Sequence, residues 1–306
     1  MILYMELGLN NKTDSALLIP FGSVDERLNG EAHLFEHAVC WQSPYLWGVT
    51  REDYILLFMH QCAEKEIINL IRNLQISEEE IDRIKRIVLK EILQEHGKEE
   101  EICGRKIWQS TEYEKSPLGT FEDVQKIRRK ELENVKRTIL MRPLFFYKEA
   151  TRIFPQREAK NMTQSVCPGL EIVRRRKLDF HKKIFLAFYF HQCPDELYVL
   201  KDIMKIFNSG RCVLLSEKRK MSAFLIDQGC KFPDRHQIPD LKKNAIDLLY
   251  RDIDEIKNNF IDRALNELES LYFRNLSWED RIFRMIHSAD ASIVNLMCQM
   301  KNHRES

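Results

Sequence analysis

Two histidines lie four residues apart, with a glutamate between them, in the segment His33-Leu34-Phe35-Glu36-His37. On a helix such positions share one face a turn apart, so His33 and His37 can offer imidazole nitrogens to one metal ion. Glu36 shares that face and can reach a water beside the ion without binding the ion itself. This H-x-x-E-H order is typical of one class of zinc peptidases. The short pattern also fits two ordinary polar histidines on a surface helix, and that alternative stays open.

A catalytic zinc ion takes three protein ligands and keeps one position open, so a third ligand must come from elsewhere in the chain. Ser77 and Glu80 form an S-x-x-E capping box that predicts the start of a long amphipathic helix, over about residues 78–102. Glu91 falls within the apolar stripe of that helix, seven residues after Ile84. A carboxylate that faces a core must be paired, protonated or bound to metal. Glu91 is therefore the candidate for the third ligand.

The elements that would position these residues follow one another in two similar halves. Each half has strands first and helices after, which predicts an α+β fold: two successive units with mainly antiparallel sheets flanked by helices. A polar stretch with two prolines, residues 155–169, is the linker candidate. We expect a metal-binding domain at residues 1–155 and a second domain at 170–306. The predicted strands are 16–19, 54–59, 144–147, 170–173, 184–189 and 223–227, and the other predicted helices are one from residue 64, then 121–140, 195–208 and one near 213–220.

Composition excludes several functional classes. The chain has 48 basic and 47 acidic residues, so its net charge of +1 creates no bulk field for nucleic acid or an anionic membrane. The amino terminus does not read as a secretory signal, and no segment has the unbroken apolar length of a membrane span. The eight cysteines are scattered without a CxxC pair, which favours reduced thiols. We therefore expect a cytoplasmic protein with no nucleic-acid or membrane partner.

Several segments, taken in order, resemble the active domain of insulinase-type (pitrilysin-type) zinc peptidases. The resemblance covers most of residues 15–150 and implies an insulinase-like half-clamshell fold, with one Zn²⁺ per chain. It implies that His33, His37 and Glu91 bind the zinc and that Glu36 is the general base. The segments that carry it are Phe21–Glu26 (FGSVDE), Gly30–His37 (GEAHLFEH), Val49–Tyr54 (VTREDY), Val88–Ile92 (VLKEI) and Ser116–Thr120 (SPLGT).

The same resemblance implies where a substrate binds. In this family an extended peptide lies along an exposed strand edge, where main-chain hydrogen bonds supply affinity and pockets supply preference. The segment from Trp47 to Tyr54 corresponds to that edge. The expected substrate-binding residues are Trp47, Gly48, Val49 and Thr50.

The second half resembles the family's inactive companion domain more faintly. In active members that domain supplies an arginine and a tyrosine that hold the substrate and its developing oxyanion. The corresponding positions here hold Ser216 and either Ala223 or Phe224. The resemblance therefore implies a paralogous partner subunit that supplies the arginine and tyrosine in a heterodimer, or otherwise a homodimer.

Together these features predict a zinc-dependent endopeptidase subunit that hydrolyses short or unfolded peptides. One such role is the removal of a leader during maturation of a ribosomally made peptide. The alternative is a catalytically silent structural or scaffold subunit of the same family. The intact motif and Glu91 favour the enzyme, and the replaced arginine and tyrosine favour the scaffold.

Overall fold

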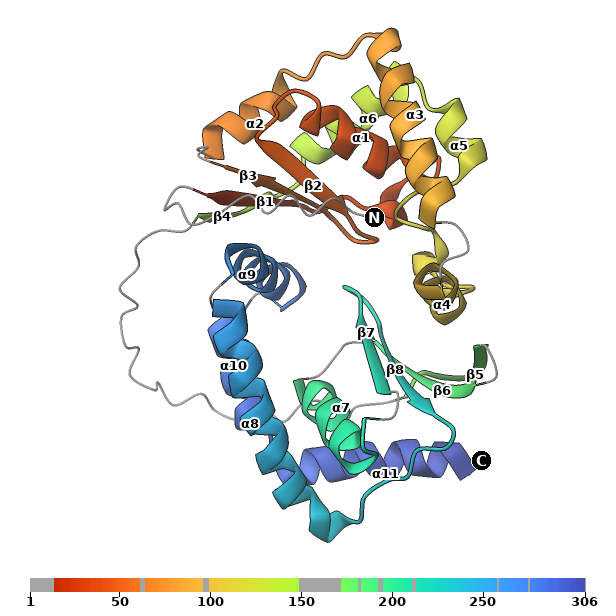
Figure 1. Cartoon of the computed structure of the whole chain (residues 1–306), viewed down its shortest axis with the longest axis vertical. Coiled ribbons are helices and arrows are strands. Elements are labelled where there is room, and N and C mark those ends of the chain that lie inside the picture. Colours follow the sequence, from red (N-terminus) through yellow and green to blue (C-terminus); the bar gives the residue numbers. More distant parts are fainter. Residues whose placement is uncertain are drawn as a thin grey trace. The chain divides into compact units, whose positions relative to one another are not determined.

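The computed structural model describes residues 14–60, 64–95, 99–148, 172–180, 183–191, 195–210, 213–257, 259–274 and 276–305. It divides into two compact units, of which the first combines the amino-terminal part of the chain with Asn259–Arg274 (Figure 1). Each unit contains a four-stranded antiparallel sheet with helices packed on it. The predicted α+β fold class is confirmed. Among the described helices, none combines the length and apolar character needed to cross a bilayer.

The first sheet has the strand order β2-β3-β1-β4. Every residue of β1 and β3 is buried, as expected for central strands that are covered on both faces. β2 lies at an edge of the described sheet and pairs on one side with β3. The strands are β1 (Ser15–Ile19), β2 (Leu46–Thr50), β3 (Ile55–Met59) and β4 (Phe145–Lys148).

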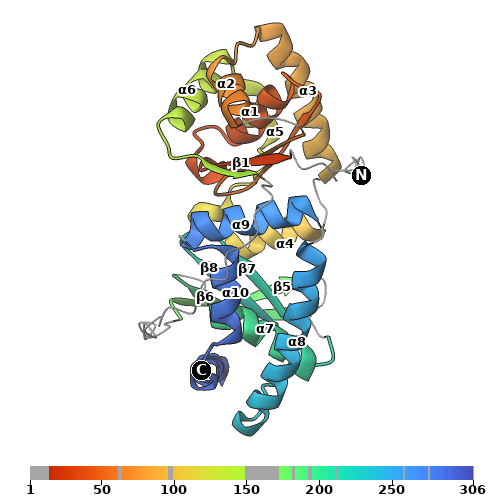
Figure 2. The same ribbon diagram turned by 90° about the vertical axis from the view of Figure 1, so that its left-hand side faces the viewer.

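One face of this sheet, which carries Leu17, Ile19 and Leu57, packs against a layer of helices and forms the larger core of the unit. The layer contains α1, which carries the histidine motif, and α3, which carries Glu91 (Figure 2). In chain order, the amino-terminal part of this unit contains the helices α1 (Glu31–Cys40), α2 (Glu64–Arg72), α3 (Glu78–Glu95), α4 (Glu99–Trp108), α5 (Phe121–Lys126) and α6 (Arg129–Leu140). It also contains the short 3-10 turns η1 (Ser23–Asp25) and η2 (Glu112–Glu114).

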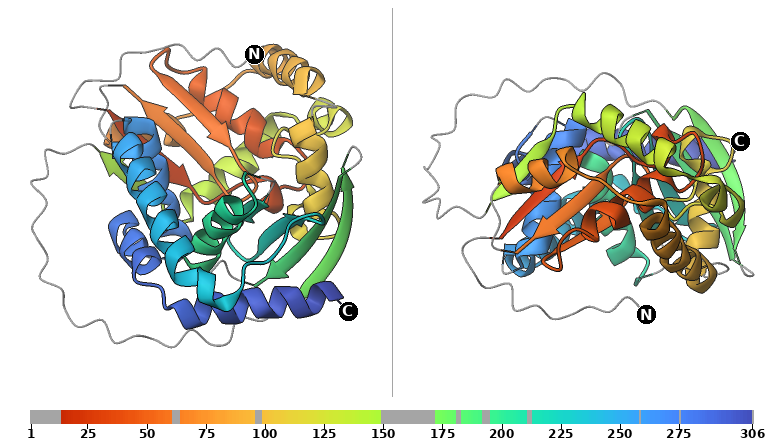
Figure 3. Two further views of the ribbon diagram at one scale, coloured as in Figure 1. Left: turned by 60° about the horizontal axis from the view of Figure 1, so that its bottom comes forward. Right: turned by 90° about the horizontal axis from the view of Figure 1, so that it is seen from above.

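The opposite face of the first sheet is covered by α9 (Phe260–Arg274), which comes from the far end of the chain (Figure 3). Phe260, Ala264 and Leu268 lie four residues apart on one helix face and pack against the sheet. The Tyr54 hydroxyl also donates a hydrogen bond to a carboxylate of this helix, Glu269. The predicted division at residues 155–170 placed α9 in the second domain, whereas the structure places it in the first unit. The reason is that α9 supplies the apolar surface that covers this second face of the first sheet.

The second unit is built around a sheet with the order β5-β6-β8-β7. Its core joins aromatic residues of the sheet, such as Phe188 and Phe224, to apolar faces of α7 and α11. Its elements are β5 (Arg174–Phe180), β6 (Lys183–Phe190), α7 (Asp195–Phe207), β7 (Val213–Glu217), β8 (Ser222–Asp227), η3 (Arg235–Gln237), α8 (Ile238–Lys257), α10 (Trp278–Ile286) and α11 (Asp290–Glu305).

Most predicted elements are confirmed, and the differences have local causes. The helix predicted near 213–220 is wrong, because this segment is β7 and pairs with β8. The helix predicted over 121–140 is interrupted at Ile127 and Arg128, where the backbone is extended and Ile127 is fully buried. The helix predicted to reach residue 102 is α3, which ends at Glu95; α4 follows, and residues 96–98 lie outside the described part. The strand predicted at 170–173 falls partly outside it, and β5 begins at Arg174.

Candidate metal centre

Helix α1 begins where two features fix its first turn. Gly30 precedes it with φ of +110°, a left-handed conformation that favours glycine, and an added Cβ would lie 2.5 Å from a methyl carbon of Val124. The buried carboxylate of Glu26 accepts hydrogen bonds from the backbone N–H groups of Gly30 (2.8 Å) and Ala32 (2.6 Å). Burial raises the pKa of Glu26 to about 7, although these hydrogen bonds oppose the shift. The start of the helix that carries both histidines is therefore tightly placed.

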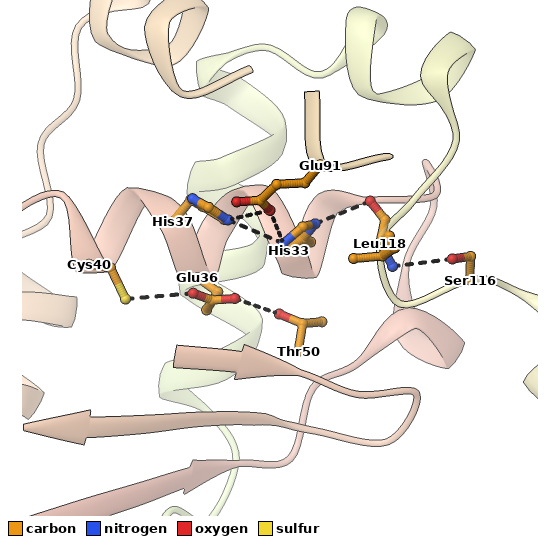
Figure 4. Close-up of polar contacts among 8 residues, drawn as sticks. All are labelled: His33, Glu36, His37, Cys40, Thr50, Glu91, Ser116 and Leu118. Atoms are coloured by element: carbon orange, nitrogen blue, oxygen red, sulfur yellow. Dashed lines mark hydrogen bonds and ion pairs between the residues drawn. The ribbon is translucent and has the colours of Figure 1, made fainter. Parts of the chain in front are cut away.

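The three predicted metal ligands converge on one point (Figure 4). The Nε2 atoms of His33 and His37 are 3.2 Å apart. The Oε2 atom of Glu91 lies 3.3 Å from Nε2 of His33 and 3.2 Å from Nε2 of His37. Helix α1 supplies both imidazoles and helix α3 supplies the carboxylate, so the packing of these two helices builds the cluster.

These separations fit a zinc ion. Ligand atoms at about 2.0–2.1 Å from a tetrahedral zinc ion lie about 3.3–3.4 Å from one another. The three distances within the cluster are 3.2, 3.2 and 3.3 Å. Two imidazole nitrogens and one carboxylate oxygen are also a donor set that zinc accepts in catalytic sites. The residues therefore suit the metal that the sequence predicts.

The hydrogen bond on the far side of His33 strengthens the fit. Nδ1 of His33 lies 3.2 Å from the carbonyl oxygen of Leu118, which can only accept, so this nitrogen is assigned as the protonated one. In a neutral ring, Nε2 then presents a lone pair toward the Glu91 oxygen. Two lone-pair atoms at 3.3 Å repel each other unless a cation, either a proton or a metal ion, lies between them.

The loop that carries Leu118 reaches His33 through a close backbone contact. Gly119 has φ of +89°, and an added Cβ would lie 2.6 Å from the Cα atom of Gly30. Sequence reasoning identified the Ser116–Thr120 loop only as a point of resemblance and missed its contact with the imidazole. A backbone carbonyl has no side-chain signal, and the glycines at 30 and 119 were the available clue.

The charges of the cluster also favour a bound cation. Burial opposes ionisation of Glu91, but its close contacts with His33 and His37 outweigh this effect and lower the pKa of Glu91 to about 2. Burial acts to lower the pKa of His37, yet the Glu91 hydrogen bond and the charges of Glu36 and Glu91 raise it overall. Two carboxylates thus give the centre a negative potential.

Glu36 competes with Glu91 for the role of third ligand, because its carboxylate and the two imidazoles lie within 4.8 Å of one another. The contacts of Glu36 separate the two roles. Its Oε1 accepts from the Cys40 thiol at 3.6 Å and its Oε2 accepts from the Thr50 hydroxyl at 3.3 Å (Figure 4). Glu91 instead points one oxygen at both Nε2 atoms. These contacts favour Glu91 as the ligand and Glu36 as the base, and both roles stay predictions.

The predicted substrate residues lie on the edge strand β2, beside the centre. Side chains alternate along a strand, and only Gly48 and Thr50 of the four are on the side of Glu36. Trp47 stacks on Phe58 with ring centroids 4.2 Å apart and packs against the apolar core between the first sheet and α9. Because Val49 is two residues from Trp47 on the same strand, its side chain is on the same side of the sheet as that of Trp47. Contact of these four residues with a substrate remains a prediction.

Comparison with known proteins shows which other proteins share this fold. No family model matches the chain, and no curated protein matches it by sequence. Its structure is similar to a protease from Helicobacter pylori, with a TM-score of 0.59 and 10% identity over 94% of this chain and 91% of that one. It is also similar to an M16-like peptidase from Alicyclobacillus acidocaldarius, with a TM-score of 0.60 and 10% identity over 93% and 89%. The chain has the fold of M16-like peptidases.

This M16-like fold, that of the insulinase-type peptidases, does not by itself decide activity. The chain is likewise similar to an M16 peptidase inactive domain from Pseudomonas fluorescens, with a TM-score of 0.54 and 10% identity over 94% of this chain and 89% of that one. At such identities only the fold is shared, so chemistry must be argued from the residues of this chain.

Proposed function

We propose that this chain is the zinc-binding subunit of an endopeptidase that hydrolyses short or unfolded peptides. The observation that carries the proposal is the convergence of His33, His37 and Glu91 at distances that suit one zinc ion, with a second carboxylate held beside them. A site with three ligands and a separate base meets the requirements of hydrolysis.

The residues of this chain would share the work as follows. A zinc ion, when bound, supplies Lewis-acid polarisation and makes water easier to deprotonate. Glu36 takes the proton of the attacking water and later delivers it to the leaving amine nitrogen. The main chain of β2, at the edge of the described sheet, can pair with an extended peptide, and the missing side chain of Gly48 lets the Glu36 carboxylate pack against this strand.

Substitution of the base tests the proposed chemistry. Glu36→Gln should keep the zinc content of the wild type and lower peptide cleavage on the order of a hundredfold or more, because the general base is lost. Cleavage of a set of unstructured peptides of known sequence can be followed by mass spectrometry. Glu122→Gln, an exposed glutamate on α5, is the matched control. Cleavage by Glu36→Gln at the wild-type rate would contradict the proposal.

The second unit supports a role for a partner. At the positions expected for the arginine and tyrosine, Ser216 is half-buried on β7, and Ala223 and Phe224 are fully buried on β8. None of these side chains can donate a guanidinium or phenol hydrogen bond to an oxyanion. We therefore propose that a paralogous subunit supplies both groups in a heterodimer, and that the pair acts in peptide maturation such as leader removal.

Reconstitution tests this partnership. The missing electrophilic donors should cost on the order of a hundredfold in rate, so cleavage should rise by about that factor when a paralogue with the arginine and tyrosine is added. The control is the same paralogue with both residues replaced. Equal rates with the two paralogues would contradict the partnership but leave the zinc site in place.

A catalytically silent scaffold subunit is the second candidate. The replacements at 216 and 223–224 and the similarity to an inactive domain favour it. A scaffold role gives no reason for the side chains of His33, His37 and Glu91 to lie at separations that suit a metal ion, so this observation favours the enzyme. Substoichiometric zinc in the purified protein, together with no cleavage beside any partner, would favour the scaffold over the enzyme.

A further inference from the structure

The carboxylate of Glu36 is held from two sides. It is 5% exposed, and each of its oxygens accepts a hydrogen bond. Thr50 on β2 donates to one oxygen and Cys40, one turn further along α1, donates to the other (Figure 4). A buried carboxylate that lost one of these donors would favour any other cation or donor within reach.

The space beside Glu36 is equally restricted. An added Cβ on Gly48 would lie 2.6 Å from Cγ and 2.8 Å from Oε1 of Glu36. The carboxylate therefore packs directly against the backbone of β2, where the hydroxyl of Thr50, two residues further on the same face, can reach it.

Glu36 needs this support because it could bind the metal itself. Its carboxylate is within 4.8 Å of the imidazole ligand atoms. If it turned toward the ion, it would take the position that a substrate or water must use, and the base would be lost. A donor on the β2 side opposes that rotation.

We propose that the Thr50 side chain is a positioning residue, whose hydroxyl, with the Cys40 thiol opposite, holds the Glu36 carboxylate in place as the base. This inference rests on the proposed function and deepens it. It gives Thr50 a side-chain role in addition to the main-chain contact with substrate that the sequence predicts.

Acetohydroxamic acid is a suitable probe, because it chelates zinc and shares a proton with a neighbouring carboxylate base. Its affinity for the zinc-loaded full chain can be measured by calorimetry for the wild type and for Thr50→Val, Thr50→Ser and Glu36→Gln. Thr50→Val removes the donor at nearly constant volume, whereas Thr50→Ser keeps it. The matched control is Thr138→Val, because among the described residues the hydroxyl of Thr138 donates only to a backbone carbonyl on α6.

We expect Thr50→Val and Glu36→Gln to weaken binding about tenfold, the effect of one lost hydrogen bond to a charged group. Thr50→Ser and Thr138→Val should bind within about twofold of the wild type, with zinc content unchanged in all variants. Wild-type affinity in Thr50→Val, or a loss in Thr50→Ser equal to that in Thr50→Val, would overturn the positioning role while leaving the zinc site intact. Failure of the wild type to bind zinc would instead overturn the proposed function, and this inference with it.

Discussion

Two carboxylates lie within reach of the same pair of histidines, and their neighbours decide what each can do. Glu91 has one oxygen near both Nε2 atoms, while Glu36 gives its oxygens to Cys40 and Thr50. Burial and the charge of Glu36 raise the pKa of the Cys40 thiol far above its usual range, so the thiol stays protonated and can donate. The division of roles follows from these hydrogen bonds.

Gly48→Ala tests how closely the base is packed. The added methyl group would overlap Glu36 and displace its carboxylate, so we expect peptide cleavage to fall roughly tenfold or more while zinc content is kept. Gly104→Ala on α4 is the control, because an added Cβ there meets no atom within 4 Å. Unchanged cleavage in Gly48→Ala would show that the carboxylate does not need its observed position.

The buried Glu26 predicts a pH dependence of stability. Its pKa is about 7 in the folded chain, against an ordinary value of 4.5 for a glutamate carboxyl, so the folded state binds the proton more tightly than the unfolded state. The free energy of unfolding should therefore fall as pH rises from about 4.5 to above 7, by about 2–3 kcal/mol from this group.

Urea titrations of metal-free protein at pH 5 and pH 8 measure this effect. Three of the four tryptophans (Trp41, Trp47 and Trp108) lie in the first unit and report its unfolding. The drop in the free energy of unfolding between the two pH values should be smaller in Glu26→Gln. An identical drop in both proteins would refute the assignment.

At the residue scale, the sequence predicted which three side chains would meet, because helical spacing and an apolar stripe are local patterns. It could not predict the contact between His33 and the Leu118 carbonyl, which joins residues 85 apart through the backbone. It also missed Cys40 as a donor to Glu36. That contact depends on the rotamers of two side chains on one helix.

At the scale of elements, α9 is the feature that the sequence could least predict. Its amphipathic pattern shows that one face must be buried, but not against which sheet. The segment at 213–217 was likewise misjudged, since its strand conformation depends on pairing with β8. The partner of α9 is far away in the sequence, and the partner of 213–217 is the next strand of a hairpin; the periodicity of either segment alone does not reveal its partner.

Leu268→Ala tests the packing of α9. Leu268 is fully buried against the first sheet, so its truncation should lower the free energy of unfolding by about 2–5 kcal/mol. Leu93→Ala on α3, at a leucine that is 65% exposed, should change it by less than about 1 kcal/mol. Equal effects of the two substitutions in urea titrations would mean that α9 does not cover the sheet in solution.

At the scale of the whole molecule, two halves with strands first and helices after were sufficient to predict the α+β class. The M16-like fold then shows that the resemblance read from a few segments was correct at the level of architecture. Activity depends on a smaller set of atoms, and positions 216 and 223–224 of the second unit carry neither a guanidinium nor a phenol. We therefore propose a zinc site whose activity depends on a partner.

The zinc content of the purified chain tests the central claim most directly. Metal analysis after dialysis should find one zinc ion per chain in the wild type and in Glu36→Gln, and a loss of zinc in His33→Ala and Glu91→Gln, because three ligands hold the ion. Absence of zinc from the wild type would contradict the account. So would retention of zinc by Glu91→Gln together with its loss from Glu36→Gln, which would exchange the roles of the two carboxylates.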